Sequence, residues 1–417
     1  MATIYAGHDN EVAAPFSRAV ATTTPLTFAA GEGAELIADD GTRYLDFISG
    51  YGVTNTGHCH PRVVAAIQAQ AQMLIHVSTV GYTEPSRAYA RRLCRLAPID
   101  DARLFYTNSG TEAVEAALKL ARYATGRPNI LSFGGGFHGR TMGSLSVTTS
   151  KAAFRAGHEP FLPGVSVAPY PRRDLAPTLA AIDQVFREQS RPDRFAACIV
   201  ESILGEGGYV TPPDEFLPAL RQLCDEHGIL LILDEVQSGF GRSGLLFACQ
   251  HSSVSPDLMT LGKGIASGLP MGALVGPASL MDAWAPGAHG NTFGGNPVAC
   301  AAAAATLDVI EGEDLAGNAA RRGAELVAAL RQQAEDYPGV LSQVRGRGLM
   351  IGLEAPTGEV AGQLRQGLLE REVIVSTCGP EGSVIRLAPP LIITREHVDR
   401  FLAASATAIH ALASTPG

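Results

Sequence analysis

Lys263 is the side chain in this sequence whose surroundings most clearly suggest chemistry. The 417-residue chain holds 32 basic residues, but only Lys119, Lys151 and Lys263 are lysines. Lys263 lies between two glycines directly after an apolar run, and glycines allow a ligand to approach the backbone closely. A desolvated lysine with a lowered pKa is a suitable nucleophile for forming a Schiff base. We expect Lys119 to form a surface ion pair with Glu115, and Lys151 to lie in a polar loop.

Asp234 is the second candidate, because it follows an apolar stretch. Residues 229–233 read Ile-Leu-Leu-Ile-Leu, and Asp234 and Glu235 come directly after them. In open α/β sheets, ligands bind beyond the carboxyl ends of the strands, so Asp234 is well placed to reach a buried cationic group. The alternative is a strand-end acid that only caps a loop.

A third group, residues 108–112, reads Asn-Ser-Gly-Thr-Glu and opens a predicted helix. Ser109 and Glu112 have the spacing of a capping box. The free N–H groups of a glycine-containing turn, here at Gly110 and Thr111, attract anions, and phosphate is the usual guest. Taken alone, the pattern favours an ordinary capped helix over a phosphate site.

A fourth group, residues 134–141, reads GGGFHGRT and matches the spacing G-x-G-x-x-G. A dinucleotide site is a weak interpretation because no helix clearly follows the motif. Phe137 could instead lie flat against a planar ring, and Arg140 could bind a carboxylate in bidentate fashion. The plainer alternatives are a core position for Phe137 and a surface ion pair for Arg140.

The elements that would position these residues alternate between apolar strands and helices. Strands are predicted at residues 103–107, 129–133, 196–202, 229–233, 257–261 and 271–275, and helices at residues 111–125 and 214–227. Many of the strands are continuously apolar, as expected when a mostly parallel sheet is buried on both faces. This pattern predicts an α/β fold.

The rhythm changes after about residue 305, where a smaller α+β domain is predicted. Its expected elements are helices at residues 315–336, at 359–371 and from 394 onward, and strands at residues 340–344, 349–353, 373–375 and 384–387. The first fifty residues form a lead-in with a hairpin-like turn at residues 39–42. We therefore predict three parts, which are an N-terminal segment (1–50) that packs with the small domain, a large domain (51–305) and a C-terminal small domain (306–417).

Composition argues against several classes of protein. The net charge of −9 argues against a nucleic-acid binder. A membrane span needs about 18 consecutive apolar residues, and no apolar run reaches this length. The N-terminus lacks the pattern of a signal peptide, and seven cysteines without CxxC spacing fit reduced thiols in a cytoplasmic protein. His58 and His60 flank Cys59, but no third ligand cluster supports a metal site there, so none is expected.

The ordered set of motifs resembles a class III aminotransferase. In chain order these motifs are SGTEAVEAALKLAR, GGGFHGRT, GEGG, LILDEVQSGFGR, LGKGIASGLPMGA, NTFGGNP and VRGRGLMIGLE. The resemblance runs from about residue 31 to residue 394, and the family includes the 4-aminobutyrate, acetylornithine and ornithine aminotransferases. It implies the type I fold of transferases that depend on pyridoxal 5′-phosphate (PLP), PLP itself as cofactor, and a homodimer with shared active sites.

The resemblance also implies a role for each matching residue. Lys263 would form the Schiff base with PLP and then transfer the substrate proton, and Asp234 would pair with the pyridine nitrogen. Phe137 and Val236 would lie on the two faces of the cofactor ring. The other implied contacts are Ser109 and His138 near the cofactor, Gly110 and Thr111 at its phosphate, Gln237 at its ring hydroxyl, and Thr292 at the phosphate of the neighbouring subunit.

Substrate choice would rest on Tyr51, Arg140, Glu206 and Arg386. The resemblance implies that Arg386 binds the α-carboxylate of glutamate and that Glu206 covers this arginine when an ω-amine binds. The tract that contains Glu206 reads ESILGEGG, whereas the family more often has EPVQGEGG. The tyrosine at position 51 resembles the ornithine enzymes, which also have a tyrosine there. Residues 373–379 and 386–390 look more like the 4-aminobutyrate group.

The expected reaction is a ping-pong transfer of an amino group from an ω-amine to 2-oxoglutarate. Amino-sugar aminotransferases and amino-acid racemases or epimerases share the chemistry of Lys263 and stay open as alternatives. An NAD(P)-dependent dehydrogenase that uses residues 134–139 is a more distant alternative.

Overall fold

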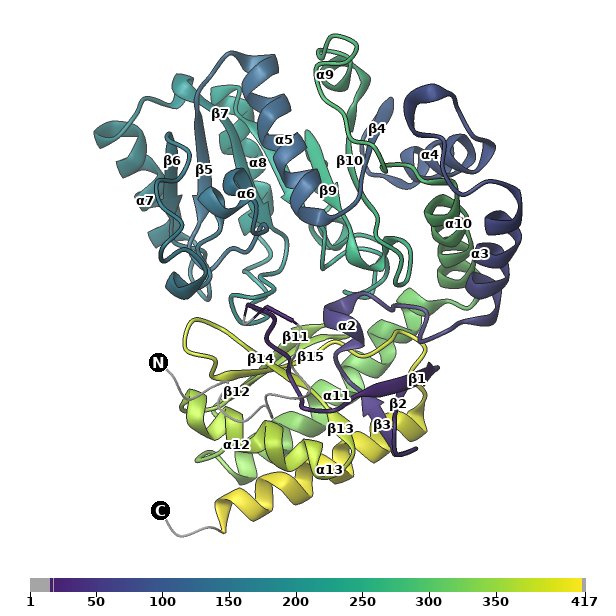
Figure 1. Ribbon diagram of the computed structural model, residues 1–417. Coiled ribbons are helices and arrows are strands. Elements are labelled where there is room, and N and C mark those ends of the chain that lie inside the picture. The colour runs from purple at the N-terminus through teal and green to yellow at the C-terminus, as the bar shows by residue number, and fades with distance from the viewer. Residues whose placement is uncertain (1–15, 18, 415–417) are drawn as a thin grey trace.

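The structure is a computed structural model that describes residues 16–17 and 19–414, so the stretch considered for a signal peptide lies outside the described residues. Figure 1 shows a larger part built around a long sheet, and below it a smaller part that holds both the first strands and the last helix.

A seven-stranded sheet forms the centre of the larger part. Its strands are β4 (Ala102–Thr107), β5 (Asn129–Phe133), β6 (Val165–Ala168), β7 (Phe195–Glu201), β8 (Leu230–Asp234), β9 (Leu258–Leu261) and β10 (Gly272–Pro277). The order across the sheet is β4-β10-β9-β8-β7-β5-β6. Neighbours from β9 to β6 are parallel, and β10 runs antiparallel to both β9 and β4. The predicted mostly parallel sheet is confirmed, while β6 is an addition, because this short, partly exposed edge strand carries little apolar pattern.

Helices cover the faces and one end of this sheet (Figure 1). They are α3 (Pro61–Met73), α4 (Glu84–Leu96), α5 (Gly110–Thr125), α6 (Met142–Val147), α7 (Ala176–Glu188), α8 (Phe216–His227), α9 (Ala278–Met281) and α10 (Pro297–Gly312). The short helix α2 (Ser49–Gly52) lies between the larger and the smaller part (Figure 1). Short 3₁₀ turns lie at η1 (Ser78–Val80), η2 (Ala152–Phe154), η3 (Pro192–Arg194), η4 (Ala248–Ser252) and η5 (Lys263–Ile265).

Helix α6 is a correction, because the sequence shows no clear helix after the GGGFHGRT motif and a six-residue helix nevertheless follows it. The two predicted helices of the larger part are confirmed as α5 and α8, each within two residues at its start. Among the described residues, no helix is both long enough and apolar enough to cross a membrane.

Side chains of the central strands alternate between two cores. Ile232 of β8 packs with Val114 of α5, whereas its neighbour Leu231 belongs to the other cluster, together with Leu220 of α8. Successive side chains of a strand point to opposite faces. Asp234 therefore lies on the same face as Ile232, which is the face that α5 covers.

The smaller part holds an antiparallel sheet covered by helices. Its elements are α11 (Leu315–Asp336), β11 (Gln343–Arg347), β12 (Met350–Glu354), α12 (Gly358–Leu369), β14 (Ser376–Cys378), β15 (Val384–Leu387) and α13 (Arg395–Ala413). The sheet order is β11-β12-β15-β14. The expected α+β pattern is confirmed, except that β11 begins three residues after the predicted Val340. The N–H groups of Val340 and Leu341 instead donate to the carbonyl of Tyr337 in a turn.

A second small sheet joins the N-terminal residues to the smaller part. Its strands are β1 (Phe28–Glu32), β2 (Glu35–Ala38), β3 (Arg43–Asp46) and β13 (Val373–Ile374). The predicted turn at residues 39–42 is confirmed as the β2–β3 hairpin. The predicted strand at residues 373–375 is shorter, because β13 pairs with β3 and the chain then joins the other sheet as β14. Phe47 stacks on Phe401 of α13 with ring centroids 4.2 Å apart. The division into three parts at residues 50 and 305 stays a prediction.

Candidate active site

Polar side chains meet at the carboxyl edge of the seven-stranded sheet. β7 ends at Glu201 and β8 at Asp234, and these residues face each other across the two strands. Lys263 follows β9, and Ser109 follows β4. Because β4 and β9 both run antiparallel to β10, their carboxyl ends reach the same edge as those of β7 and β8. We use the name strand-end cluster for Ser109, Gly110, Thr111, His138, Glu201, Asp234 and Lys263.

Helix α5 begins at this edge with a cap that differs in part from the prediction. Ser109 Oγ accepts a hydrogen bond from the N–H of Glu112 at 3.3 Å. The Glu112 carboxylate accepts from the N–H of Asn108 at 2.7 Å, one residue before the cap, so the second half of the predicted capping box is wrong. A Cβ at Gly110 would lie 2.6 Å from Val236 Cγ1, so only glycine fits there.

Hydroxyl groups gather at the N-terminal end of α5. Thr111 Oγ1 lies 2.7 Å from Ser144 Oγ and 2.9 Å from Thr141 Oγ1. A Cβ at Gly139 would lie 2.1 Å from Thr111 Oγ1, so the turn that follows β5 packs directly on this hydroxyl. Hydroxyls beside the N–H groups of a helix N-terminus are suited to hold an anion such as phosphate.

Asp234 is buried and accepts a hydrogen bond on each carboxylate oxygen. Its Oδ1 accepts from the N–H of Val236 at 3.1 Å, and its Oδ2 from Nδ1 of His138 at 2.7 Å. Burial opposes a charge on His138, but the hydrogen bond to Asp234 and its negative charge outweigh burial and raise the pKa of the imidazole. His138 thereby holds the Asp234 side chain in place, and a carboxylate held in this way is suited to a cationic partner.

Glu201 is a buried acid that the sequence analysis overlooked. Its two oxygens accept from the N–H groups of Phe137 at 2.8 Å and Gly205 at 2.9 Å, so it holds both loops in place. Burial raises the pKa of Glu201 to about 7, the charge of His138 opposes this, and the charge of Asp234 adds to it. Its position at the end of an apolar strand is the same signal that pointed to Asp234.

Lys263 lies where the backbone leaves little room for other residues. A Cβ at Gly262 would be 3.2 Å from Gly110 Cα, and one at Gly264 would be 2.4 Å from Asn55 Nδ2. Lys263 itself has a left-handed φ of 45°, a strained conformation that is often found at functional sites. Burial, and next the charge of Arg386, lower the pKa of Lys263 to about 8. About a tenth of the amine is therefore neutral and nucleophilic at about pH 7, far more than for a lysine with the ordinary pKa.

Tyr51 and Gln237 connect this cluster to the smaller part. Gln237 Nε2 donates to the backbone carbonyl of Tyr51 at 3.1 Å. The Tyr51 hydroxyl lies 2.6 Å from Oγ1 of Thr23, and its ring lies 4.6 Å from the guanidinium carbon of Arg386. Tyr51 has a φ of 68°, so its backbone is also strained. The structure thus places Tyr51 between the predicted cofactor contact Gln237 and the predicted carboxylate-binding Arg386.

Four charged residues form the second group, which we name the charged rim. Nη1 of Arg386 donates to Oε2 of Glu206 at 2.6 Å, and Nζ of Lys151 donates to Oε1 of Glu206 at 2.7 Å. Burial raises the pKa of Glu206, but the charges of Arg386 and Lys151 outweigh burial and lower it. Glu206 is therefore a carboxylate held between two cations. The members of the charged rim are Arg140, Lys151, Glu206 and Arg386.

Arg140 is the exposed member of the charged rim. Its guanidinium carbon lies 3.7 Å from the ring centroid of Phe154 and 5.8 Å from that of Phe137. Among the described residues it has no ion-pair partner, so the predicted alternative of a surface ion pair is not observed. A guanidinium that is stacked and uncovered is available to a carboxylate.

The two other lysines lie in surroundings that the sequence did not indicate. Lys119 does not pair with Glu115, and its Nζ instead lies 2.9 Å from Nδ1 of His289. Glu115 is already engaged, because its Oε1 accepts from the N–H of Ser144 at 3.0 Å. Lys151 does lie in a loop, but its ion pair with Glu206 brings it into the charged rim. The sequence could not show this pair, since the partners are 55 residues apart.

Thr292 is the predicted site residue that the structure does not bring to the others. It is exposed, and within the described part of the chain it contacts neither the strand-end cluster nor the charged rim. Its neighbour Asn291 donates from Nδ2 to the carbonyl of Tyr106 at the end of β4. His58 and His60 face different acids. Nε2 of His58 lies 2.8 Å from the Asp46 carboxylate, and Nε2 of His60 lies 3.3 Å from the Glu313 carboxylate.

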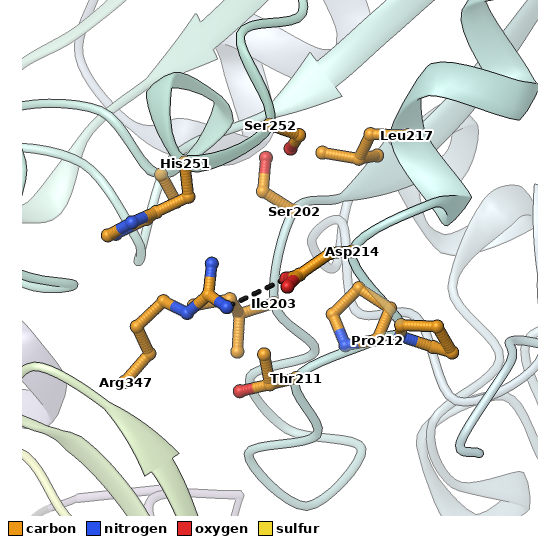
Figure 2. A pocket seen from close by; sticks show the side chains of 11 residues that line it. Ser202, Ile203, Thr211, Pro212, Asp214, Leu217, His251, Ser252 and Arg347 are labelled. Atoms are coloured by element: carbon orange, nitrogen blue, oxygen red, sulfur yellow. Dashed lines mark hydrogen bonds and ion pairs between the residues drawn. The ribbon is translucent and has the colours of Figure 1, made fainter.

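Figure 2 shows a separate small pocket that none of the predicted site residues lines. Arg347 points across it to Asp214, and the two form an ion pair at 2.9 Å. Ser202, which also lines the pocket, donates to Glu235 at 2.8 Å. Glu235 follows Asp234 directly but accepts its hydrogen bonds on this other side, including the N–H of Cys249 at 2.7 Å. Asp234 thus belongs to the strand-end cluster, whereas its neighbour Glu235 holds loops together on the other side.

Comparison with known proteins identifies the family. The family model for class III aminotransferases matches residues 16–409. The chain belongs to this family, so it is an aminotransferase whose cofactor is PLP. This membership decides against the dehydrogenase that the glycine motif left open.

The matches extend over nearly the full length of the relatives. Acetylornithine aminotransferase from Methanopyrus kandleri is 45% identical over 387 residues, which cover 93% of this chain and 95% of that protein. The 5-aminovalerate aminotransferase DavT from Pseudomonas putida is 38% identical over 400 residues, covering 93% and 94%. Among solved structures, ornithine aminotransferase from Toxoplasma gondii ME49 has a TM-score of 0.88 at 31% identity, covering 95% of this chain and 93% of that one. A PLP-bound amine transaminase from an uncultivated Pseudomonas species has a TM-score of 0.87 at 34% identity, covering 95% and 98%.

The strand-end cluster fits PLP on structural grounds. Lys263 has no hydrogen-bond or ion-pair partner among the described residues, so its amine is free to bond to an aldehyde. The buried Asp234 suits a protonated ring nitrogen, and the capped start of α5 suits a phosphate. When bound, PLP supplies a conjugated ring that accepts the electron pair left on the substrate carbon after that carbon loses a proton.

Proposed function

We propose that this enzyme moves the amino group of an ω-amine that also carries a carboxylate to 2-oxoglutarate, by a ping-pong mechanism. The observation that carries the proposal is the contrast between two arginines. Arg386 is buried and covered by Glu206 at 2.6 Å, whereas Arg140 is exposed and has no acidic partner among the described residues. One carboxylate site is therefore closed by an internal acid, and the other is open.

The two arginines serve the two half-reactions in this proposal. An ω-amine substrate places its distal carboxylate on Arg140, while Glu206 keeps the charge of Arg386 neutralised. Glutamate or 2-oxoglutarate needs its α-carboxylate on Arg386, so the Glu206 side chain moves aside. Each guanidinium can bind a carboxylate through two parallel hydrogen bonds. Because the two arginines bind carboxylates at different places, one active site can accept substrates of different shape.

The donor class rests on the relatives and on Tyr51. The curated relatives include enzymes named for acetylornithine and 5-aminovalerate, and both compounds carry a terminal amine and a carboxylate. Tyr51 lies beside Arg386 and is anchored by Thr23, which supports a role in shaping the carboxylate site. N-acetylornithine and 5-aminovalerate are therefore the first donors to test, followed by ornithine and 4-aminobutyrate.

Lys263 is the proposed acid and base of the reaction. Its Nζ takes the proton from the substrate carbon that bears the amine and returns a proton in the following step. The lowered pKa of about 8 keeps a useful share of the amine neutral for the first task. Asp234, supported by His138, holds a negative charge beside the pyridine nitrogen of PLP and keeps that nitrogen protonated.

The remaining cofactor contacts are proposals of the same kind. Gly110 and Thr111 at the start of α5 hold the phosphate, with Ser109 as the helix cap. Phe137 and Val236 enclose the ring, and Gln237 donates to the ring hydroxyl. Each of these side chains or N–H groups lies at the carboxyl edge of the central sheet or in a loop that packs on it.

A homodimer with shared sites is also part of the proposal. Thr292 is exposed in the single chain and is proposed to reach the phosphate bound by a second copy. Large apolar side chains near this segment are also exposed, among them Met73, Ile75, Tyr82 and Phe293. An apolar surface of this kind is typical of an interface between subunits.

The seven cysteines are free thiols, which supports a reducing, cytoplasmic setting.

The test is a panel of single half-reactions on the PLP-loaded enzyme. Each candidate amine is added without a keto acid, and the absorption of the bound cofactor is followed. Conversion by glutamate and by one ω-amine, lost in Lys263→Ala, supports the proposal and names the donor. If an amino sugar is the donor instead, the enzyme is an amino-sugar aminotransferase. If no amine converts the cofactor but a chiral amino acid loses its optical purity, the protein is a racemase or epimerase.

A further inference from the structure

Lys151 is a member of the charged rim to which the proposed function assigns no role. Its Nζ donates to Oε1 of Glu206 at 2.7 Å, while Arg386 uses the other oxygen, Oε2, at 2.6 Å. The side chains of Lys151, Glu206 and Arg386 are 20%, 13% and 8% exposed. Glu206 is thus shared between two cations that reach it from different parts of the fold, a loop after α6 and strand β15.

The backbones on both sides of the Lys151–Glu206 pair are fastened. The N–H groups of Thr149 and Ser150 donate to the carbonyl of Gly136 at 2.7 and 3.0 Å, which ties the Lys151 loop to the glycine tract before Phe137. The carbonyl of Glu206 accepts from the N–H of Gly379 at 2.8 Å. These backbone bonds favour a rotation of the Glu206 side chain over a movement of its loop when Glu206 leaves Arg386, and a rotation about the side-chain bonds allows Oε1 to stay near Lys151.

The electrostatics of this movement show what Lys151 contributes. A buried carboxylate that loses its only cationic partner is strongly destabilised, because desolvation is no longer offset. With Lys151 present, Glu206 that leaves Arg386 still has an ion-pair partner. Without Lys151, Glu206 has Arg386 alone, and a substrate carboxylate can displace it only by leaving it unpaired.

We propose that Lys151 is a positioning residue that keeps Glu206 paired when Arg386 binds a substrate carboxylate, and that it thereby sets the balance between the two substrates. This inference rests on the proposed exchange of Glu206 for a substrate carboxylate at Arg386. It predicts that Lys151 promotes the half-reaction with glutamate or 2-oxoglutarate and has little influence on the half-reaction with the ω-amine.

A direct contact between Lys151 and the distal carboxylate of the ω-amine is the competing interpretation. Nζ of Lys151 lies 5.3 Å from the ring centroid of Phe154, on which Arg140 also stacks. The position of Nζ nevertheless favours Glu206, since the ammonium already donates to that carboxylate. The two interpretations differ in which substrate a neutral residue at position 151 would affect.

The experiment compares three variants of the PLP-loaded enzyme, namely Lys151→Met, Lys151→Arg and, as a matched control, Lys119→Met. Lys119 is the lysine that pairs with His289 and lies outside both groups. Each half-reaction is followed separately, and calorimetry measures the binding of glutarate, a dicarboxylate without an amine, and of valerate, which has a single carboxylate. Lys151→Met is expected to weaken glutarate binding and to slow the glutamate half-reaction by about tenfold. The effect should be no larger, because the Lys151–Glu206 ion pair is partly exposed and solvent screens it. Lys151→Arg and Lys119→Met should stay close to the parent enzyme, as should valerate binding in every variant.

A second background tests the coupling to Glu206. In Glu206→Gln the acid carries no charge to be paired, so adding Lys151→Met should have no further effect on glutarate binding. Equal effects of Lys151→Met in both backgrounds, or a larger loss for valerate than for glutarate, would overturn the inference. If the parent enzyme does not react with glutamate at all, the proposed function fails and this inference fails with it. If the parent reacts with both substrates and Lys151→Met matches it, only the inference fails.

Discussion

The strand-end cluster and the charged rim are both parts of the candidate active site but are held by different forces. The cluster is fixed by strand register and by glycines that let the backbone segments approach to contact, as at Gly110 and Gly262. The rim takes its charges from a loop, a strand and two glycine-rich tracts. Ion pairs hold Lys151, Glu206 and Arg386, and Arg140 stacks on Phe154. A framework of packed backbone cannot move without unfolding locally, whereas ion pairs can exchange partners.

This difference suggests a division of labour. The strand-end cluster is expected to serve both half-reactions equally, because the cofactor is common to both. The charged rim is expected to distinguish the substrates, because they differ in where they carry a carboxylate. Substitutions in the two regions should therefore give different patterns, and not merely different magnitudes.

The largest effect is expected for Lys263→Ala in the strand-end cluster. The variant loses the amine that bonds to PLP and the base that moves the proton, so both half-reactions should slow by at least about 10³-fold. Single-turnover rates with glutamate and with 5-aminovalerate measure this effect, and Lys119→Ala is the control. A variant that retained one half-reaction would contradict the assignment of Lys263.

Asp234→Asn should have the next largest effect. The amide keeps the shape of the side chain but cannot support a positive charge on the ring nitrogen, so both half-reactions should fall by about 10²- to 10³-fold, to a similar extent. Measuring the two single-turnover rates and the affinity for PLP separates lost chemistry from lost binding. A fall confined to one substrate would move Asp234 from the shared framework to the selective rim.

The arginines of the charged rim should give smaller effects of opposite selectivity. Arg140→Gln is expected to lower the specificity constant for 5-aminovalerate by about 10- to 100-fold and that for glutamate by less, because glutamate keeps its α-carboxylate on Arg386. Arg386→Gln should do the reverse, because it removes the site for the α-carboxylate. The specificity constants of the two half-reactions provide the measurement. Equal losses for both substrates in both variants would show that the rim does not divide the substrates in this way.

The smallest expected effect concerns pH and links the two regions. Burial and the charge of Arg386 lower the pKa of Lys263 to about 8, and only the neutral amine attacks an aldehyde. The rate at which the cofactor-free enzyme captures PLP should therefore rise about tenfold between about pH 7 and pH 9 and then level off. Arg386→Gln removes a positive charge and leaves Glu206, so the pKa of Lys263 should increase and the rise should move to higher pH.

The control for this pH profile is Arg140→Gln. Arg140 is not among the main charges that shift the pKa of Lys263, so its loss should leave the profile nearly in place. A profile that moved with Arg140→Gln and not with Arg386→Gln would contradict the electrostatic link between the rim and the cluster.

Much of the strand-end cluster was predictable because its signals are local. Lys263 and Asp234 each follow an apolar strand, and parallel strands bring their carboxyl ends to one edge. Glu201 carries the same signal and was overlooked, since the strand was predicted to run on to Ser202, which placed Glu201 inside the strand and not at its end. The charged rim was harder to foresee, because a lysine in a polar loop resembles any solvated lysine until its partner is known.

The sequence by itself determined most of the elements, the fold class and the candidates Lys263 and Asp234, because apolar periodicity, helix caps and strand-end acids act over a few neighbouring residues. The family resemblance implied that Glu206 covers Arg386, but only the tertiary structure decided that Lys151 shares the same carboxylate. Glu206 and Arg386 are 180 residues apart, and Lys151 joins them from a third segment. Ion pairs depend on distance in space, so their partners follow from the way the sheets and loops pack, and no local pattern records that packing.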